Sequence, residues 1–293
     1  MPVDVAGMRF VIAHRPAFEA TMRVLPLPSA AHYEIASDKR LLAAFMQEHK
    51  IPAPAPATLL DIWNGLAAKL VGFRFPVLLK PIRRCGGQGI VRYDEPATLL
   101  QAVADLPETD QYIIQNCLEW FDIDCNVLCQ NGRLVAHSIQ KALVASAGKY
   151  APAEAIEFVR SSAVLAVVDR LMRALCWNGV AHLDLRYDAR DQQIKVVEVN
   201  TRFWPAVVAS AVTAKVNFPA LACLAATGRP VLPGPSALGR YIPFATFLKL
   251  RFGRRPTATG PAIAFAWRRR PTFYRAGPHG RARQYGPGPR LRL

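Results

Sequence analysis

The residues best suited to chemistry lie in two adjoining segments in the second half of the chain. Asp184 belongs to the segment GVAHLDLRYD, and Glu198, Asn200 and Arg202 follow in VVEVNTR. Both segments read as strands that are joined by a polar turn near Asp191, and side chains on a strand alternate between its two faces. Such a turn places Asp184 directly opposite Glu198 on one face of the hairpin, with Asn200 and Arg202 beside them.

This polar face, which His182 and Arg186 share, admits two interpretations. Two carboxylates held side by side repel each other unless a cation lies between them, and oxygen ligands of this kind suit Mg²⁺ together with substrate phosphates. An arginine beside them would be placed to stabilise a transferring phosphoryl group. The other interpretation is a solvated polar face on which the charges pair among themselves.

A second candidate site precedes this hairpin in the chain. The apolar segment FPVLLKP contains Lys80 near its end, and a loop with Gly86, Gly87 and Gly89 follows. A lysine at a strand end before a loop of exposed backbone N–H groups is an arrangement that binds phosphates. The pattern is not a P-loop, because the lysine precedes the glycines and no Gly-Lys-Ser/Thr follows. An ordinary tight turn is the alternative.

Hydrophobic periodicity predicts the elements that must position these residues. Ser37 is expected to cap a helix over 38–49, and a proline-rich extended segment, IPAPAP, follows that helix. Further helices are expected around 59–71, 95–106, 154–176, 206–214 and 219–226, and strands over 75–81, 112–115, 123–128, 133–140, 179–187 and 194–202. The strands over 123–128 and 133–140 are expected to form a hairpin through Gln130-Asn131-Gly132.

Charge is distributed unevenly along the 293 residues, which carry 37 Lys+Arg against 21 Asp+Glu. No acidic residue follows Glu198, and 12 Arg and one Lys lie from Arg240 onwards, so the last 54 residues carry +13. The first 239 residues carry 24 bases against 21 acids, or +3, so the body lacks the basicity that suggests a nucleic-acid or membrane-surface protein. The tail is either a weak polyanion contact or an extension without a partner.

The six cysteines form no CxxC pair and have no histidine spaced to complete a zinc site. They are expected to be small buried residues in a reducing compartment. We see no signal peptide, so we expect a cytoplasmic protein. The apolar stretch over 203–228 is broken by Pro205, Lys215 and Pro219, which favours a buried helix pair over a membrane span.

The order of these motifs resembles the ATP-grasp superfamily, and within it the carbamoyl-phosphate-synthetase-like branch. The matching pieces are Asp38-Lys39 before IPAPAP, FPVLLKP, the loop GGQG, YIIQNCLEWFDIDCNVL, GVAHLDLRYD and VVEVNTRFW. The resemblance implies an α+β fold in which two α/β subdomains hold ATP between them. It covers an ATP-grasp domain over 37–230, preceded by 1–36 as the remnant of a truncated preATP-grasp domain and followed by a basic Pro/Gly/Arg-rich extension over 231–293.

The resemblance also implies roles for individual residues. The phosphates of ATP would be contacted by Lys80, by Lys39 as a weaker second base, and by the loop glycines Gly86, Gly87 and Gly89. The linker residues Gln115, Asn116 and Leu118 would meet the adenine edge through their backbone, and Asp122 would contact the ribose. Asp184 and Glu198 would hold Mg²⁺ or Mn²⁺, with Glu198 between two ions and Asn200 on the second. Arg202 would stabilise the transferring phosphoryl group or an acyl phosphate.

A carboxylate-amine ligase is the function that this resemblance implies. Such an enzyme uses ATP to convert a carboxylate into an acyl phosphate, which an amine or similar nucleophile then attacks. Positioning and charge neutralisation supply most of the catalysis, so no nucleophile triad is required. A degenerate ATP-grasp module that binds nucleotide without turnover is the alternative, and a phosphotransferase on the same fold is a third. The sequence does not identify the carboxylate, the acceptor or the oligomeric state, and a homo-oligomer is one of the open states. A partner could supply the surface that the missing preATP-grasp domain provides.

Overall fold

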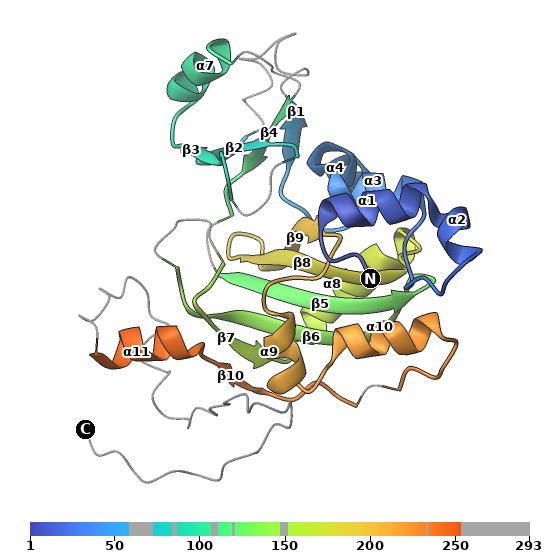
Figure 1. The fold of residues 1–293 in the computed structure, drawn as a ribbon. Coiled ribbons are helices and arrows are strands. Elements are labelled where there is room, and N and C mark those ends of the chain that lie inside the picture. The colour runs from blue at the N-terminus through green and yellow to red at the C-terminus, as the bar shows by residue number, and fades with distance from the viewer. Residues whose placement is uncertain are drawn as a thin grey trace.

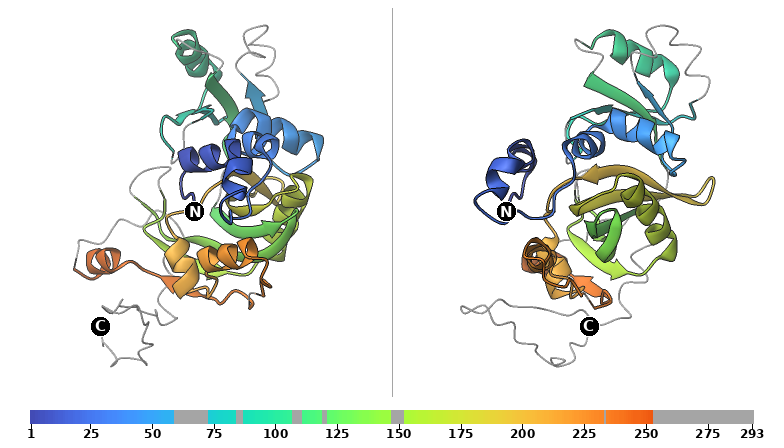
Figure 2. Two further views of the ribbon diagram at one scale, coloured as in Figure 1. Left: turned by 45° about the vertical axis from the view of Figure 1, so that its right-hand side comes forward. Right: turned by 90° about the vertical axis from the view of Figure 1, so that its right-hand side faces the viewer.

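The computed structural model describes residues 1–58, 73–83, 87–106, 111–118, 121–146, 152–232 and 234–252. Two antiparallel sheets dominate it: a small sheet that projects from the body and a large sheet at the centre (Figures 1 and 2). The helix expected around 59–71 and the loop residue Gly86 lie outside the described residues.

The small sheet has the strand order β1-β4-β2-β3, with every pair antiparallel. Its strands are β1 (Pro56–Thr58), β2 (Val77–Pro81), β3 (Val91–Tyr93) and β4 (Tyr112–Asn116). One face packs on helix α7 (Pro96–Ala104), where Val77 and Ile114 meet Leu99 and Val103. Because side chains alternate, Lys80 on β2 points from the opposite face, away from α7.

The large sheet has the order β10-β7-β6-β5-β8-β9 and is likewise antiparallel. Its strands are β5 (Asp122–Gln130), β6 (Arg133–Val144), β7 (Ala155–Val159), β8 (Gly179–Asp188), β9 (Gln193–Asn200) and β10 (Gly239–Tyr241). The predicted β5–β6 hairpin is confirmed. Asn131 and Gly132 at its turn have φ of 49° and 78°, the left-handed pair that suits a two-residue hairpin loop.

Helix α8 (Ser162–Ala174) covers one face of the large sheet, where Val168 and Leu171 pack on Cys125 and Leu183 in the main core. The single helix expected over 154–176 is wrong, because its first part forms β7. Ala155, Ile156 and Phe158 are buried when this segment pairs with β6 and β10. Long-range pairing therefore overrides local helix periodicity here.

The other face of the large sheet changes character along its length. At one end Leu128, Ala136 and Val180 form an apolar surface that is covered by the helices α9 (Val207–Val212) and α10 (Phe218–Ala226). The predicted buried helix pair after residue 203 is thus present. No helix in the described ranges is both long enough and apolar enough to cross a bilayer. The opposite end of the same face is polar and lies toward the small sheet.

The N-terminal segment packs on the same core. It forms α1 (Val5–Ala13), α2 (Arg15–Glu19), α3 (Ala30–Ser37) and α4 (Lys39–Glu48), with Met8 and Tyr33 buried in the main core. Ser37 ends α3, so the expectation that it caps the next helix is wrong. Asp38 is the cap of α4, because its Oδ1 accepts hydrogen bonds from the backbone N–H groups of Arg40 and Leu41.

Residues beyond the expected boundary at 230 also contribute to the large sheet. Strand β10 pairs with β7, and Arg240 donates a hydrogen bond to Glu157 at 3.1 Å. Helix α11 (Phe244–Phe252) follows, and residues 253–293, which carry most of the basic tail, lie outside the described residues.

The cysteines follow the expectation in part. Cys117, Cys125 and Cys129 are buried free thiols, whereas Cys176 and Cys223 are free but exposed, so the expectation of burial is wrong for these two. Cys176 follows the end of α8 with a φ of 43°, and Cys223 lies on the outer side of α10.

Candidate active site

The polar end of the large sheet brings three carboxylates into one row. Asp184 on β8 pairs with Asp124 on β5 and with Glu198 on β9. In the next row His182 pairs with Asn126 and with Asn200. Residues directly opposite each other on antiparallel strands point to the same face. The predicted juxtaposition of Asp184 and Glu198 is confirmed.

A β-bulge in β9 produces this register. Toward the hairpin end Leu185 pairs with Val196, but the next pair is Asp184 with Glu198, so Val197 is an extra residue on β9. Because of this extra residue, Val196 and Val199, and not Val197, are the buried valines of β9. The backbone N–H of Val196 donates to the carbonyl of Pro52 at 2.9 Å, which fixes β9 beside the bulge.

Lys39 reaches the site from the first residue of α4. Its Nζ donates to Glu198 Oε1 at 3.2 Å, and Ser37 Oγ lies 3.3 Å from Thr201 Oγ1, which fixes the α3–α4 junction to the end of β9. Burial raises the pKa of Glu198, and the Asp184 charge adds to this, although Lys39 opposes both. Glu198 is therefore a mostly buried carboxylate with Lys39 as its direct ionic partner.

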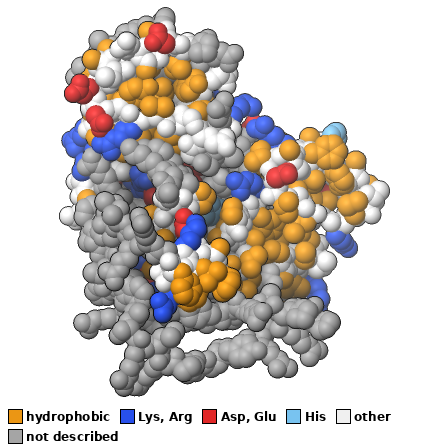
Figure 3. Space-filling model, turned by 60° about the vertical axis from the view of Figure 1, so that its left-hand side comes forward, with side chains coloured by type: hydrophobic (Ala, Val, Ile, Leu, Met, Phe, Trp, Pro, Cys, Tyr) orange, Lys and Arg blue, Asp and Glu red, His pale blue; other side chains and the backbone are white. Residues whose placement is uncertain are grey.

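Lys80 enters from the small sheet and is buried. Its Nζ donates to Gln115 Oε1 at 2.6 Å. The pKa of Lys80 is lowered to about 8, mainly by burial; Glu198 opposes this shift, and the charges of Lys39 and Arg186 contribute to it. Lys80 thus belongs to the same electrostatic site as the carboxylates of the large sheet. On the face shown in Figure 3, Lys and Arg side chains gather where the small sheet meets the body.

The linker between β4 and β5 joins the two sheets. Asn116 shares the α7 face of the small sheet with Ile114, and its backbone N–H donates to the carbonyl of Ala55 at 3.3 Å. Two arginines of the β8–β9 hairpin hold the next carbonyls: Arg190 donates to Cys117 O at 2.7 Å and Arg186 donates to Leu118 O at 3.1 Å.

Asp122, at the start of β5, is mostly exposed and forms a two-pronged ion pair with Arg186. The predicted contacts of this residue and of the linker with a nucleotide stay predictions.

Arg202 and the loop glycines complete the predicted set. Arg202 follows β9 and donates from Nη1 to the carbonyl of Phe203 at 2.9 Å. Gly87 and Gly89 have φ of 76° and 73°, so this loop uses backbone conformations that favour glycine.

Of the predicted site residues, the structure brings together Lys39, Lys80, Asp184, Glu198 and Asn200. The roles of these residues toward phosphate and metal stay predictions.

Sequence reasoning missed a hydrogen-bonded chain beside the carboxylates. Gln140 Nε2 donates to Asp124 Oδ2 at 3.1 Å, and Asn126 Nδ2 donates to Gln140 Oε1 at 3.1 Å. His182 Nδ1 lies 2.6 Å from Asn126 Oδ1, and its Nε2 lies 3.0 Å from Asp184 Oδ1. The alternation of Asp122, Asp124 and Asn126 in FDIDCN was the signal that could have found this chain.

Burial and neighbouring charges shift the pKa values of the side chains in this hydrogen-bonded chain. Burial raises the pKa of Asp124 to about 7, although His182 opposes the shift. Burial lowers the pKa of His182, but the Asp184 and Asp124 carboxylates outweigh this and raise it above the ordinary value. The His182 ring stacks on Trp204, with ring centroids 5.8 Å apart and an interplanar angle of 19°.

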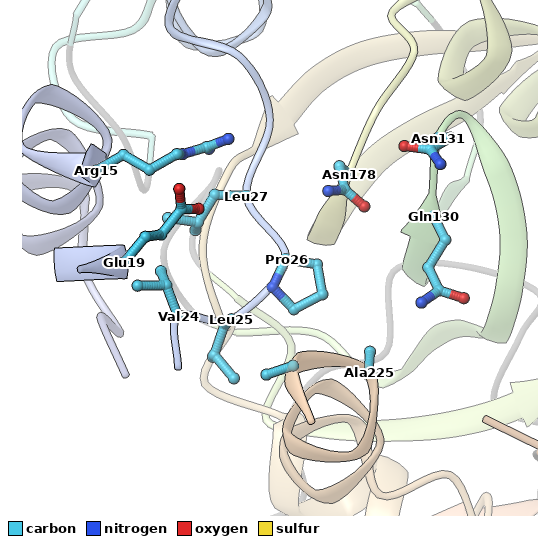
Figure 4. A pocket seen from close by; sticks show the side chains of 11 residues that line it. Arg15, Glu19, Val24, Leu25, Pro26, Leu27, Gln130, Asn131, Asn178 and Ala225 are labelled. Carbon is cyan, nitrogen blue, oxygen red and sulfur yellow. The ribbon is translucent and has the colours of Figure 1, made fainter. Parts of the chain in front are cut away.

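Two cavities lie away from this site. One, of about 450 Å³, lies between α2, the segment after it, the β5–β6 turn and α10, at the far end of β5 from Asp122 (Figure 4). The other, of about 630 Å³, lies between α8 and the β8–β9 hairpin. None of the sequence-predicted site residues is among the described residues that line them.

The donor set fits a nucleotide bound with magnesium. Asp184, Glu198 and the Asn200 amide oxygen are the ligand types that Mg²⁺ prefers. Asn200 Nδ2 donates to Asp184 Oδ2 at 3.3 Å, which leaves the Asn200 Oδ1 free to face a cation. Lys80 and Lys39 are positive groups of the kind that phosphates require.

Comparisons with known proteins agree with this geometry. The family model described as the ATP-grasp domain matches residues 36–205, and no curated protein sequence matches the chain significantly.

Among solved structures, an L-amino acid ligase from Bacillus licheniformis has a TM-score of 0.55 at 19% identity, over 74% of this chain and 53% of that one. The biotin carboxylase domain of a Hydrogenobacter thermophilus 2-oxoglutarate carboxylase, solved with MgADP, has a TM-score of 0.63 at 16% identity, over 80% of this chain and 55% of that one. A carboxyaminoimidazole ribonucleotide synthase from Aspergillus clavatus, solved with ATP, has a TM-score of 0.61 at 12% identity, over 78% and 60%.

These likenesses show a shared fold, and the chain spans only a little over half the length of the first two proteins. The family match is stronger, because it covers more than half of the 293 residues. It includes the strands that carry Lys80, Asp184 and Glu198 and ends beyond Arg202. The chain belongs to the ATP-grasp domain family.

Proposed function

We propose that this chain is a magnesium-dependent ATP-grasp ligase, which activates a carboxylate as an acyl phosphate for attack by an amine or similar nucleophile. One observation carries the proposal: Asp184, Glu198 and Asn200 lie on one face of the large sheet, beside Lys39 of α4 and the buried Lys80 of the small sheet. This arrangement has the cations and metal ligands that phosphoryl transfer needs.

The reaction has two steps that balance. In the first, a carboxylate oxygen attacks the γ-phosphorus of ATP and the bond to the ADP oxygen breaks. In the second, the amine nitrogen attacks the acyl carbon, phosphate leaves with the former carboxylate oxygen, and the amine gives up a proton to solvent. The products are an amide, ADP and phosphate.

The protein's own residues contribute binding and charge. Lys80 and Lys39 would hold the phosphates of ATP, and Arg202 would stabilise the transferring phosphoryl group or the acyl phosphate. Asp184, Glu198 and Asn200 would hold Mg²⁺, which neutralises phosphate charge when it is bound. The Arg186 and Arg190 contacts to the linker carbonyls would keep the two sheets in register around the nucleotide.

The decisive experiment follows oxygen rather than ADP alone. The protein is incubated with Mg²⁺, ATP, a panel of ¹⁸O-labelled carboxylates and a panel of amines, and phosphate is examined by mass spectrometry. A ligase transfers one ¹⁸O from carboxylate to phosphate and forms ADP only when both substrates are present. A binding module gives ATP binding with no ADP, and a phosphotransferase gives a stable phosphorylated product that needs no amine.

Two variants tie the reaction to the site. Glu198→Gln removes a charge from the expected metal ligands and should lower turnover by at least a hundredfold, or about 3 kcal/mol of transition-state stabilisation. Glu48→Gln makes the same change on an exposed residue of α4 and should leave turnover unchanged. Equal turnover in both variants would remove the metal site from the mechanism.

A further inference from the structure

A group of side chains beside the expected magnesium ligands has a different chemistry. Asp124, His182 and Asp184 each offer a ligand atom, and these atoms all lie within 4.8 Å of one another. The expected magnesium ligands Asp184, Glu198 and Asn200 offer oxygen alone. This second group adds an imidazole nitrogen, and Asp184 is common to both groups.

The hydrogen-bonded chain behind the group fixes the orientation of His182. The Gln140 amide nitrogen donates to Asp124 Oδ2, and the Gln140 amide oxygen accepts from Asn126. Asn126 uses both amide hydrogens, on Gln140 Oε1 and on Ser138 Oγ at 3.0 Å, so its own oxygen must accept. His182 Nδ1, 2.6 Å from that oxygen, therefore carries hydrogen.

This assignment leaves His182 Nε2 as the nitrogen with the lone pair in the neutral ring. That nitrogen lies 3.0 Å from Asp184 Oδ1, which is also an acceptor. A cation at this position, whether a proton or a metal ion, joins the two acceptors, and the position of the three side chains suits either one. Asp124 on the neighbouring strand adds further negative charge to the same place.

Each of the three groups is also held from behind, as metal ligands in proteins are. Asn126 holds His182, Gln140 holds Asp124, and Asn200 Nδ2 lies 3.3 Å from Asp184 Oδ2. The Asn126 and Ser138 side chains are fully buried, and Trp204 stacks on the His182 ring, so rotation of the imidazole is restricted.

We propose that Asp124, His182 and Asp184 form a binding site for one divalent transition-metal ion. Imidazole nitrogen favours ions such as Mn²⁺, Co²⁺ or Zn²⁺ over Mg²⁺. Bonds of about 2.0–2.2 Å would require the three side chains to close by only a small amount. Asp184 then lies between two ions, with Oδ1 facing His182 and Oδ2 facing Asn200. The site needs no nucleotide, so it stands apart from the proposed ligase activity.

The test uses the full chain without nucleotide, loaded with Co²⁺ or Mn²⁺ in a large excess of Mg²⁺. Wild type should retain one equivalent of Co²⁺ with visible absorption bands, and pulsed EPR of bound Mn²⁺ should show coupling to one imidazole nitrogen. His182→Gln should lose the nitrogen coupling and bind Co²⁺ at least tenfold more weakly. His137→Gln, on the α8 face of β6, is the matched histidine control and should behave as wild type.

Two carboxylate variants separate this site from the magnesium site. Asp124→Asn should weaken Co²⁺ binding with the nitrogen coupling reduced, and it provides a second test if His182→Gln does not fold. Glu198→Gln should leave the nitrogen-coupled ion in place. Failure of wild type to retain Co²⁺ against Mg²⁺, or a nitrogen coupling that persists in His182→Gln, overturns the proposal. The first result would mean that a proton on His182 Nε2, and not a metal ion, joins the ring to Asp184.

Discussion

Lys80 gives nucleotide binding a pH dependence whose sign and size follow from the structure. The pKa of the buried ammonium is lowered to about 8 in the free protein. Phosphates stabilise the charged form, so a bound nucleotide raises this pKa. Below pH 8 the lysine is already charged, whereas above pH 8 binding must take up a proton. Affinity therefore falls as pH rises through 8.

The magnitude follows from proton linkage. If the pKa of Lys80 is about 8 in the free protein and Lys80 is fully charged in the complex, the dissociation constant is proportional to 1 + 10^(pH − 8). The dissociation constant for ATP should rise by about 25-fold from pH 7.5 to pH 9.5, which is about 1.9 kcal/mol. At pH 9, binding should take up about 0.9 proton per nucleotide.

Titration calorimetry measures both quantities. ATP is titrated in EDTA, in buffers of different ionisation enthalpy, so that proton uptake appears as a buffer-dependent heat. Lys80→Gln should bind weakly at every pH with no proton uptake, and Lys80→Arg, which stays charged, should lose the pH dependence while it keeps a cation. Lys50→Gln, an exposed lysine after α4, is the control for lost charge. Absence of proton uptake by wild type at pH 9, or its persistence in Lys80→Gln, would refute the reasoning.

Two further predictions concern stability. Burial opposes ionisation of Asp188, but hydrogen bonds from Lys195 and Arg190 outweigh it and lower its pKa to about 2. The folded pKa lies below the unfolded value, so this stabilisation is present above pH 4 and is lost as pH falls through 2. Asp188→Asn should cost about 2 kcal/mol in urea unfolding at pH 7 and less at pH 3, and an equal cost at both would contradict the assignment. Gly179→Ala should cost more than 1 kcal/mol, because a Cβ there would lie 2.2 Å from Pro26 O at a φ of +102°. Gly228→Ala, at φ +69° with no atom within 4 Å, should cost about 1 kcal/mol, so equal losses would show that the Pro26 contact is unimportant.

Local patterns determined most of the large sheet. Strand alternation predicted that Asp184, Glu198 and Asn200 share a face, and the Asn131-Gly132 turn predicted the β5–β6 hairpin. These features depend on residues close in sequence, so the alternation of side chains along a strand and the residue types at the turn suffice to predict them. The motif order was also enough to indicate the ATP-grasp family, which the match over residues 36–205 bears out.

Periodicity failed where distant segments compete with local preference. The segment over 155–159 has a helical pattern but becomes β7, because β6 and β10 offer strand edges on both sides of it. Sequence reasoning likewise chose Asp122 and overlooked Asp124. Only the pairing of β5 with β8, which are far apart in sequence, shows that Asp124 lies opposite Asp184.

The sequence by itself determined which residues of the hairpin could form a metal-binding face. The tertiary structure decided their register and their surroundings. The observed β8–β9 turn pairs Asp188 with Gln193, which is one residue out of the register expected from a turn near Asp191 and would place Asp184 opposite Val197. The bulge beside the Val196 contact to Pro52 restores Glu198 to that position. Helix α4 and the small sheet then deliver Lys39 and Lys80. A bulge and an inter-sheet approach depend on contacts between distant segments, which no local pattern specifies.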